Sequence, residues 1–171
     1  MAYFEWAEDM EIDGGGPIDQ DHQLLVRQVN ELHTATSRGE GRAVVASLLQ
    51  RTITSTRDHL RREEELMAQK GFPDLEKHKM GHDHFLESLY SLQKRLDSGG
   101  ITVAAQLSAV LRDWLSLHIR RGDKKLRKFE QNLQREQQRQ ALQARLDALG
   151  RTTSTLERRS QPGSKSSLLP H

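Results

Sequence analysis

Apolar residues recur every three or four positions in four segments of the chain: residues 19–38, 42–70, 74–97 and 102–122. This spacing places apolar side chains on one face of an α-helix. In the second segment the repeating positions are Val45, Leu48, Leu49 and Ile53. The alternation with a period of two that is typical of β-strands is missing from the sequence. The pattern therefore predicts an all-α protein built on four long helices.

Glycine and proline mark the breaks around these segments, at residues 14–17, 39–41, 71–73 and 99–100. Links this short force helices that follow one another in sequence to pack side by side and antiparallel. We therefore expect an up-down-up-down four-helix bundle that is preceded by an N-terminal arm.

The apolar pattern weakens after the fourth segment. Residues 135–140 are all polar, and a narrow apolar stripe then returns at Leu142, Leu146 and Leu149. From residue 150 the chain is rich in Ser, Thr and Arg, a composition that cannot bury a core. We predict three parts: a bundle domain over residues 1–130, a helical extension over 131–149 and a disordered tail over 150–171.

The formal net charge of +2 hides an uneven distribution. Residues 1–130 carry 19 Lys and Arg against 21 Asp and Glu, whereas residues 131–171 carry 7 against 3. A slightly acidic body argues against a basic nucleic-acid-binding face on the main domain. The basic segment 131–171 has three interpretations: a solvated tail, a helix that docks on a partner protein, or an address read by a larger assembly.

Composition also bears on the compartment. No apolar run approaches the roughly 18 residues that a membrane-spanning helix needs. The first residues have neither the basic start nor the apolar stretch of a secretory signal, and the chain has no cysteine to form a disulfide. We therefore expect a cytoplasmic protein without a membrane span.

Histidine spacing is the most informative feature of the sequence. His59 and Glu63 stand four residues apart in the second segment, and His78 and His82 stand four apart in the third. Residues four apart lie on one face of a helix, about one turn from each other. Each pair can therefore bind one metal ion or two adjacent ions.

His118 and Asp123 stand five residues apart near the end of the fourth segment. Five steps along an ideal α-helix rotate a side chain by about 140° from the starting face. Gly122 weakens the helix just before Asp123 and favours a π-type bulge, which would bring the two side chains together. His22 lies one turn inside the first helix, so the alternating helix directions bring all seven residues to one end of the bundle.

Five imidazoles and two carboxylates in one place indicate a metal centre. Imidazole with carboxylate suits Fe, Mn, Zn or Cu. Seven donors are too many for one ion, whereas two octahedral ions use all of them if both carboxylates and a solvent oxygen bridge. The count then leaves one coordination position open for a small ligand.

These residues resemble the motifs of the bacterial hemerythrins over about residues 1–130. The matching stretches are Ile18-Asp19-Gln20-Asp21-His22, His59-Leu60-Arg61-Arg62-Glu63-Glu64-Glu65-Leu66-Met67, Phe72-Pro73 with His78-Lys79-Met80-Gly81-His82, and Trp114-Leu115-Ser116-Leu117-His118 with Asp123. The resemblance implies a non-haem di-iron centre that binds dioxygen reversibly, as in an oxygen carrier, store or sensor.

The same resemblance implies how the ligands divide between the ions. One iron would be held by His78, His82 and His118. The other iron, which has the open position, would be held by His22 and His59. The bridges would be Glu63, Asp123 and an oxo or hydroxo group.

An apolar pocket would protect bound dioxygen from water and protons. Six residues match lining positions of the family: Leu25, Leu60, Met67, Trp114, Leu115 and Ile119. Leu60 departs from the aromatic residue usually found there, which implies a more open pocket.

Two other interpretations of the centre stay open. The same site could belong to a di-iron enzyme that acts on peroxide, nitric oxide or Fe(II), or to a structural bundle filled by zinc. The sequence shows no additional acid or base near the open position, which favours dioxygen binding over catalysis. No Glu-x-x-His motif occurs, and this separates the chain from the ferritin-like di-iron oxidases.

Acidic residues near the ligands have simpler interpretations. Glu64 and Glu65 rotate off the face of Glu63, so we expect both to be solvated. We expect Asp19 and Asp21 to cap the first helix, although Asp19 could instead orient a ligand histidine.

Histidines outside the set of seven are not expected to bind metal. His33 lies nearly on the face of His22 but about 16 Å further along the helix, so we expect a buried structural histidine. His84 is two residues from His82 and is expected to point elsewhere.

Overall fold

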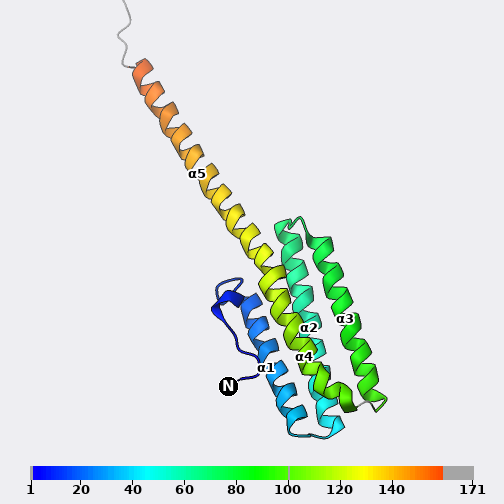
Figure 1. Cartoon of the computed structure of the whole chain (residues 1–171). Coiled ribbons are helices and arrows are strands. Elements are labelled where there is room, and N and C mark those ends of the chain that lie inside the picture. The colour runs from blue at the N-terminus through cyan, green and yellow to red at the C-terminus, as the bar shows by residue number, and fades with distance from the viewer. Residues whose placement is uncertain (1, 100, 160–171) are drawn as a thin grey trace, which may run out of the picture. The chain divides into compact units, whose positions relative to one another are not determined.

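The computed structural model describes residues 2–99 and 101–159, and all regular structure in these ranges is helical (Figure 1). The bundle consists of α1 (Pro17–Ser37), α2 (Arg42–Lys70), α3 (Leu75–Asp97) and α4 (Ile101–Leu117). Each helix packs on the next one in sequence, and α4 also packs on α1, which closes the bundle. The predicted all-α, up-down-up-down four-helix bundle is confirmed.

Three further helices flank the bundle helices in sequence. They are the short 3-10 helix η1 (Glu8–Met10) in the N-terminal arm, the π-helix η2 (His118–Asp123) and α5 (Lys124–Arg159). Because η2 directly continues α4, the chain passes from α4 into α5 without a loop.

Local sequence explains where α1 begins and where α2 ends. Pro17 occupies the first turn of α1, where its missing N–H costs no hydrogen bond. The Asp13 carboxylate accepts hydrogen bonds from the backbone N–H of Ile18 at 2.9 Å and of Asp19 at 3.1 Å. Helix α2 ends at Gly71, whose φ of 68° lies in the left-handed region that glycine adopts without strain.

The core runs along the bundle and includes the N-terminal arm. Its fully buried side chains include Leu32, Leu49, Ile53, Leu89, Leu96 and Leu107. Each side chain of this size stabilises the fold by about 1.5–3 kcal/mol when it is fully buried. The arm contributes the buried Phe4, and the Asn30 side chain pairs with the backbone N–H and C=O of Phe4, both at 2.8 Å. The N-terminal arm is therefore part of the same hydrophobic core as the four helices.

The chain divides after Glu130 into two compact units. The second unit, considered by itself, is helical as far as Arg159, with Leu142 and Leu146 exposed. The prediction that disorder begins at residue 150 is wrong for residues 150–159, because a single glycine costs a helix only about 1 kcal/mol and no proline follows before Pro162. The rest of the predicted tail, residues 160–171, lies outside the described residues.

No helix within residues 2–99 and 101–159 is long and apolar enough to cross a membrane.

Candidate metal centre

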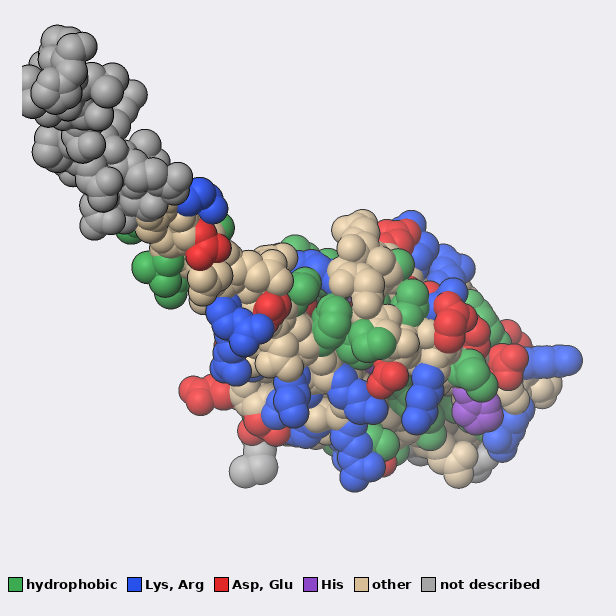
Figure 2. Space-filling model, turned by 90° about the horizontal axis from the view of Figure 1, so that it is seen from above, with side chains coloured by type: hydrophobic (Ala, Val, Ile, Leu, Met, Phe, Trp, Pro, Cys, Tyr) green, Lys and Arg blue, Asp and Glu red, His purple; other side chains and the backbone are tan. Residues whose placement is uncertain are grey.

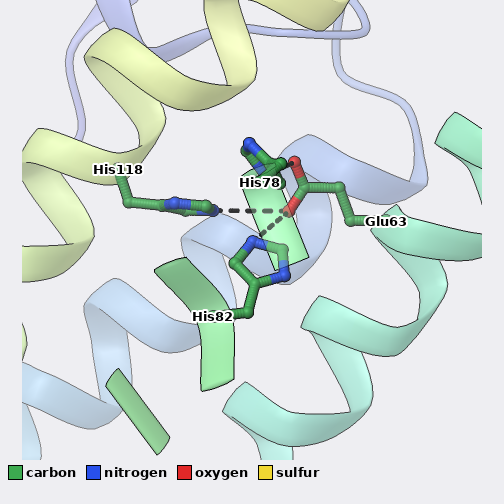
Figure 3. A group of neighbouring side chains, drawn as sticks. All are labelled: Glu63, His78, His82 and His118. Carbon is green, nitrogen blue, oxygen red and sulfur yellow. Dashed lines mark hydrogen bonds and ion pairs between the residues drawn. The ribbon is translucent and has the colours of Figure 1, made fainter. Parts of the chain in front are cut away.

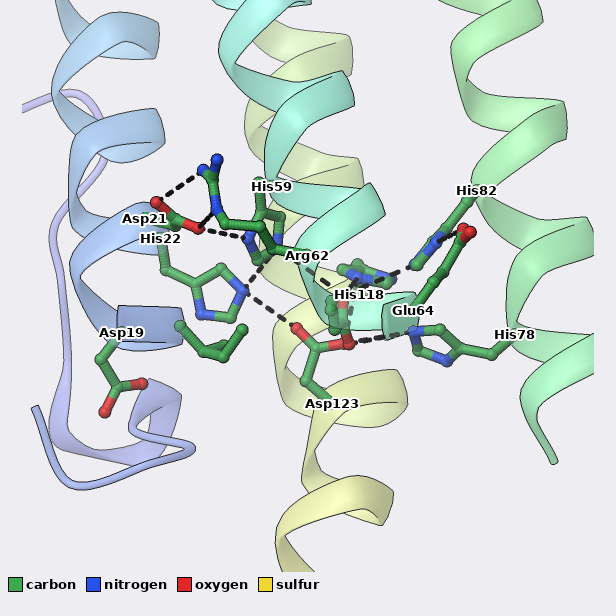
Figure 4. A network of polar contacts seen from close by, with 12 residues as sticks. Asp19, Asp21, His22, His59, Arg62, Glu64, His78, His82, His118 and Asp123 are labelled. Carbon is green, nitrogen blue, oxygen red and sulfur yellow. Dashed lines mark hydrogen bonds and ion pairs between the residues drawn. The ribbon is translucent and has the colours of Figure 1, made fainter. Parts of the chain in front are cut away.

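All seven predicted ligands come together at one end of the bundle. Helix α1 contributes His22, α2 contributes His59 and Glu63, α3 contributes His78 and His82, and η2 contributes His118 and Asp123. The five histidines and Asp123 are labelled in Figure 4. His22, His59, Glu63 and Asp123 have no exposed surface.

The π-helix η2 is what allows His118 and Asp123 to meet. Its wider turn places residues five apart on one side, and Nε2 of His118 lies 3.0 Å from Oδ1 of Asp123. The predicted π-type distortion is confirmed. Gly122 leaves room for both rings within it, because a Cβ at this position would lie 3.0 Å from Cε1 of His78 and 3.4 Å from Nδ1 of His118.

Glu63 lies among four imidazoles, three of which, His78, His82 and His118, are seen in Figure 3. Its Oε1 is 3.1 Å from Nε2 of His78, and its Oε2 is 3.3 Å from Nε2 of His118. Oε2 is also 3.6 Å from Nε2 of His82 and 3.7 Å from Nε2 of His59. Every one of these histidines therefore directs the same ring nitrogen toward the carboxylate.

Asp123 lies between the remaining histidine and the group around Glu63. Its Oδ2 is 3.1 Å from Nε2 of His22, whereas its Oδ1 faces His118 and, at 3.6 Å, Nε2 of His78. Nε2 of His22 is in turn 3.0 Å from Nε2 of His59 (Figure 4). The two rings thus converge on one point, as two ligands of a single ion would.

The residues fit a bound metal. Within the described part of the chain, Nε2 of His82 and both carboxylate oxygens of Asp123 are buried and make no hydrogen bond of adequate geometry, although imidazole nitrogens lie 3.0 and 3.1 Å from the Asp123 oxygens. Buried polar groups normally have partners, and buried carboxylates need a compensating positive charge. Cations coordinated by these imidazoles and carboxylates would satisfy both requirements, and the donor set suits Fe, Mn, Zn or Cu.

Electrostatics within the centre follow from burial and close carboxylates. Burial opposes ionisation of Asp123, but His118 and His22 beside it hold its pKa well below the usual range. Burial lowers the pKa of His118, yet Asp123 and Glu63 raise it to about 10. Burial, assisted by the charge of His118, lowers the pKa of His82 to about 3. The carboxylates are therefore ionised, and His82 is a neutral imidazole that can bind a metal.

Two carboxylates outside the ligand set contact ligand rings. Oε1 of Glu64 lies 2.7 Å from Nδ1 of His82, and Oδ2 of Asp21 lies 3.4 Å from Nδ1 of His59. Arg62 donates two hydrogen bonds of 2.9 Å to Asp21 (Figure 4). Burial tends to raise the pKa of Asp21, but His59 and Arg62 lower it to about 2.

These contacts correct two predictions. Glu64 is not simply solvated, because it lies on the side of α2 that faces α3 and reaches His82. Asp21 does not cap α1, because its carboxylate is bound by Arg62 and His59. The position of Glu64 directly after a ligand, and of Asp21 directly before one, was the available signal.

Asp19 also has a different role from those predicted. Its carboxylate accepts hydrogen bonds from the backbone N–H of Ile12 at 2.7 Å, Asp13 at 3.2 Å and Gly15 at 2.8 Å. Figure 4 shows it directed toward the N-terminal arm and away from the histidines. Asp19 therefore holds the arm, while Asp13 caps the helix and Asp21 contacts the ligand.

A small cavity lies about one helical turn from the ligands. Its volume is about 10 Å³, and it lies between Leu25, Val29, Thr52, Thr56, Phe85, Leu111, Trp114 and Leu115. Trp114 connects it to the centre, since its ring stacks on His118 at 4.3 Å between centroids and on Phe85 at 3.6 Å.

Three of the six predicted pocket residues line this cavity: Leu25, Trp114 and Leu115. The other three, Leu60, Met67 and Ile119, are buried but do not line it. Met67 instead packs with Phe72 and Leu126 in a separate cluster beyond the ligands.

The remaining histidines of the described chain lie away from the centre. His33 is half-buried rather than buried, stacks on Tyr3 at 3.6 Å between ring centroids and lies 3.5 Å from the Ser108 hydroxyl. His84 is exposed.

Known proteins share this sequence and fold. Residues 16–129 match the hemerythrin HHE cation binding domain. A bacteriohemerythrin of Stenotrophomonas maltophilia (strain R551-3) is 32% identical over 123 residues, which cover 72% of this chain and 78% of that protein. A bacteriohemerythrin of Methylococcus capsulatus (strain ATCC 33009 / NCIMB 11132 / Bath) is 31% identical over 124 residues, which cover 72% of this chain and 94% of that protein.

Solved structures agree with the sequence matches. A crystal structure of a hemerythrin mutant with one leucine changed to alanine superposes with a TM-score of 0.68 at 29% identity, and covers 75% of this chain and 98% of that one. Because the family match spans more than half of the sequence, the chain belongs to the hemerythrin family, which supports reversible dioxygen binding at a non-haem di-iron site as its function.

Proposed function

We propose that this hemerythrin binds dioxygen reversibly at two iron ions bridged by Glu63, Asp123 and an oxo or hydroxo group. In this proposal one ion is held by His78, His82 and His118. The other ion is held by His22 and His59 and keeps a coordination position open for dioxygen. Iron bound by these residues would supply the electrons for reversible dioxygen binding, one from each ion.

The observation that carries this proposal is the placement of the Asp123 carboxylate. Its Oδ2 faces Nε2 of His22 at 3.1 Å, and its Oδ1 faces Nε2 of His118 at 3.0 Å. One carboxylate with an oxygen directed to each histidine group is the arrangement that a bridging ligand requires. Its own charge, together with that of Glu63, offsets part of the charge of two cations.

Residues around the cavity exclude water and withhold protons. None of the eight side chains that line it is ionisable. The two hydroxyls among them donate elsewhere, since Oγ1 of Thr52 bonds the carbonyl of Leu48 at 2.9 Å and Oγ1 of Thr56 bonds the carbonyl of Thr52 at 2.8 Å. A lining without a free proton donor favours release of dioxygen over its further reduction, which supports binding rather than catalysis.

Outer carboxylates keep the imidazoles in the orientation that binding needs. Glu64 contacts Nδ1 of His82 and Asp21 contacts Nδ1 of His59, so Nε2 of each ring is left to face the centre. Partners of this kind fix the tautomer and increase the basicity of a ligand histidine.

Optical spectroscopy of the iron-loaded protein tests the proposal. We expect a nearly colourless Fe(II) form that gains a visible charge-transfer band in air and loses it when oxygen is removed. A spectrum that never changes would contradict dioxygen binding. Steady consumption of peroxide or nitric oxide over many turnovers would indicate an enzyme instead, and one zinc per chain would indicate a structural bundle.

The physiological use of oxygen binding and the function of residues 131–171 also belong to this proposal. Carriage, storage or sensing of oxygen in the cytoplasm, and contact with a partner through residues 131–171, are predictions from the sequence. All seven proposed ligands precede residue 124, so we expect a chain that ends at residue 130 to bind iron and dioxygen as the full chain does. A change in assembly size on truncation would support the partner interpretation.

A further inference from the structure

Two of the five ligand histidines reach the protein surface. The side chains of His78 and His118 are 9% and 8% exposed, whereas the other three are at most 1% exposed. Both exposed rings line a groove that also includes Phe72, Asp74, Lys77, Gly81, Gly122 and Lys125. This groove shares no residue with the apolar cavity. The centre therefore has a second, polar approach.

Glycines keep the rings in this groove uncovered. Gly81 of α3 and Gly122 of η2 both line it, and a Cβ at Gly122 would already lie 3.0 Å from Cε1 of His78. A larger side chain at Gly122 would add atoms next to the His78 and His118 rings. The outer edges of two ligand imidazoles are thus open to contact from outside.

Positive charge surrounds this opening. Lys77 on α3 and Lys125 on α5 line the groove, and Asp74 is the only acidic residue among the eight lining residues. Arg121 and Lys128 precede and follow Lys125 by four and three residues, which extends the positive charge along one side of the helix. Both are exposed, and no ion pair involving any of these four cations is found in the described part of the chain. Figure 2, which looks down on the bundle, shows Lys and Arg side chains interspersed with Asp and Glu over the visible face.

The coordination of the two exposed histidines restricts the function that this groove can have. Under the proposed function, His78 and His118 bind the ion that already has six ligands, so the groove offers no coordination position to a small molecule. An imidazole edge can nevertheless pass an electron, because it is bonded to the metal on one side and reaches the surface on the other. A hemerythrin whose irons have been oxidised to Fe(III) without dioxygen must receive electrons before it can bind oxygen again.

We infer that this groove is the docking site of an acidic one-electron carrier protein that reduces the centre. The carrier loses one electron in each of two encounters, and each Fe(III) gains one to become Fe(II). The row from Arg121 to Lys128 is about 10 Å long, which suits the surface of a protein better than a small anion. This inference rests on the proposed function, since it requires the di-iron centre.

Charge reversal on the full-length, iron-loaded protein tests the inference. The probe is a reduced, acidic [2Fe–2S] ferredoxin, mixed with the Fe(III) form at low ionic strength. We expect Lys77→Glu combined with Lys125→Glu to slow reduction by about tenfold or more, because attraction between opposite charges speeds encounter. Added salt should slow reduction of the parent protein by ferredoxin and have little effect on reduction of the double variant.

Matched controls separate docking from damage to the centre. Lys94→Glu changes an exposed lysine of the same helix α3, about 25 Å from Lys77, and should leave the rate unchanged. Reduction by methyl viologen radical cation, which positive charge does not attract, should not become slower in the double variant. Calorimetric titration with oxidised ferredoxin gives an independent measure, and binding should weaken only in the double variant.

Several outcomes would overturn the inference. Equal rates and equal ferredoxin binding for the double variant and Lys94→Glu would exclude docking at the groove. Equal slowing with ferredoxin and methyl viologen would place the effect on the centre itself. Oxygen binding by each variant is measured separately, so loss of the reversible spectrum in the parent would count against the proposed function, whereas an intact spectrum with unchanged reduction rates would count against docking alone.

Discussion

The Glu64 carboxylate lies 2.7 Å from Nδ1 of His82, on the side of the ring that faces away from the metal centre (Figure 4). A carboxylate in this position fixes the tautomer of a ligand histidine and strengthens its other nitrogen as a donor. Glu64→Gln preserves the size of the side chain and removes its charge. We expect iron affinity to fall about 10- to 100-fold, measured as iron retained against a graded series of chelators.

Glu65→Gln is the matched control for this change. Glu65 is the next residue along α2, is exposed and pairs with Arg61 at 3.4 Å, so its loss should leave iron affinity unchanged. Equal iron loss in both variants would show that Glu64 does not act through His82.

The Asp21 and Arg62 pair gives a second test, on the other side of the centre. Arg62 fixes Asp21, and Asp21 contacts Nδ1 of His59, so the two residues should act on iron binding as one unit. We expect Asp21→Asn and Arg62→Met each to weaken iron binding, and the double variant to lose less than the sum. A double-mutant cycle should give a coupling energy of about 0.5–3 kcal/mol. Additive losses would mean that Arg62 does not act through Asp21.

Gly122 and Gly81 offer a comparison of two glycines in adjacent helices. A Cβ at Gly122 would lie 3.0 Å from Cε1 of His78, whereas a Cβ at Gly81 would have no heavy atom within 4 Å. We therefore expect Gly122→Ala to displace His78, lower iron content and destabilise the protein by about 1–3 kcal/mol. Gly81→Ala should retain iron and stabilise α3 by up to about 1 kcal/mol. Iron analysis and urea unfolding of both variants measure these effects. Full iron content in Gly122→Ala would contradict the predicted displacement of His78.

The spacing of the ligand residues along the helices is what predicts the metal centre from the sequence. His59 with Glu63, and His78 with His82, mark the face of a helix directly because residues four apart must share it. The spacing of five between His118 and Asp123 was informative for the opposite reason: it fits one centre only if the helix changes its turn, as η2 does.

The spacing of residues within one helix does not predict which neighbouring helix a side chain faces. Whether Glu64 points to solvent or to His82 depends on where α3 lies around α2, and sequence spacing within one helix does not contain that angle. The same limit applies to the pocket, because Met67 and Ile119 are buried near ligands but face other neighbours than the cavity. The sequence does not predict the continuation of α5 past Gly150, because one glycine weakens a helix without ending it.

His118 and His33 test the ligand assignment on chemically identical side chains. His118→Ala removes a ring whose Nε2 lies 3.3 Å from Glu63 and 3.0 Å from Asp123, so iron content should fall. His33→Ala removes a ring that stacks on Tyr3, so it should lower stability slightly and leave iron content intact. Iron analysis of the purified variants measures this difference, and equal loss of iron in both would contradict the assignment.

We expect the attachment of the N-terminal arm to depend on pH, because the Asp19 carboxylate holds it. Burial tends to raise its pKa, but hydrogen bonds from the backbone N–H of Gly15, Ile12 and Asp13 outweigh this, so the pKa of Asp19 lies below its usual value. A group whose pKa is lower in the folded protein stabilises it fully above the unfolded value, about 3.9, and loses this effect as the pH falls through the folded value.

Asp19→Asn should therefore cost about 1–3 kcal/mol at pH 7 and less at pH 3, which lies below the unfolded pKa of about 3.9. Amide hydrogen exchange at Ile12 and Gly15 should become faster in the variant, since these N–H groups lose a charged acceptor. Asp97→Asn changes an exposed acid at the end of α3 and serves as the control that should alter neither quantity. A cost of Asp19→Asn that stays constant between pH 7 and pH 3 would mean that the ionised carboxylate is not what holds the arm.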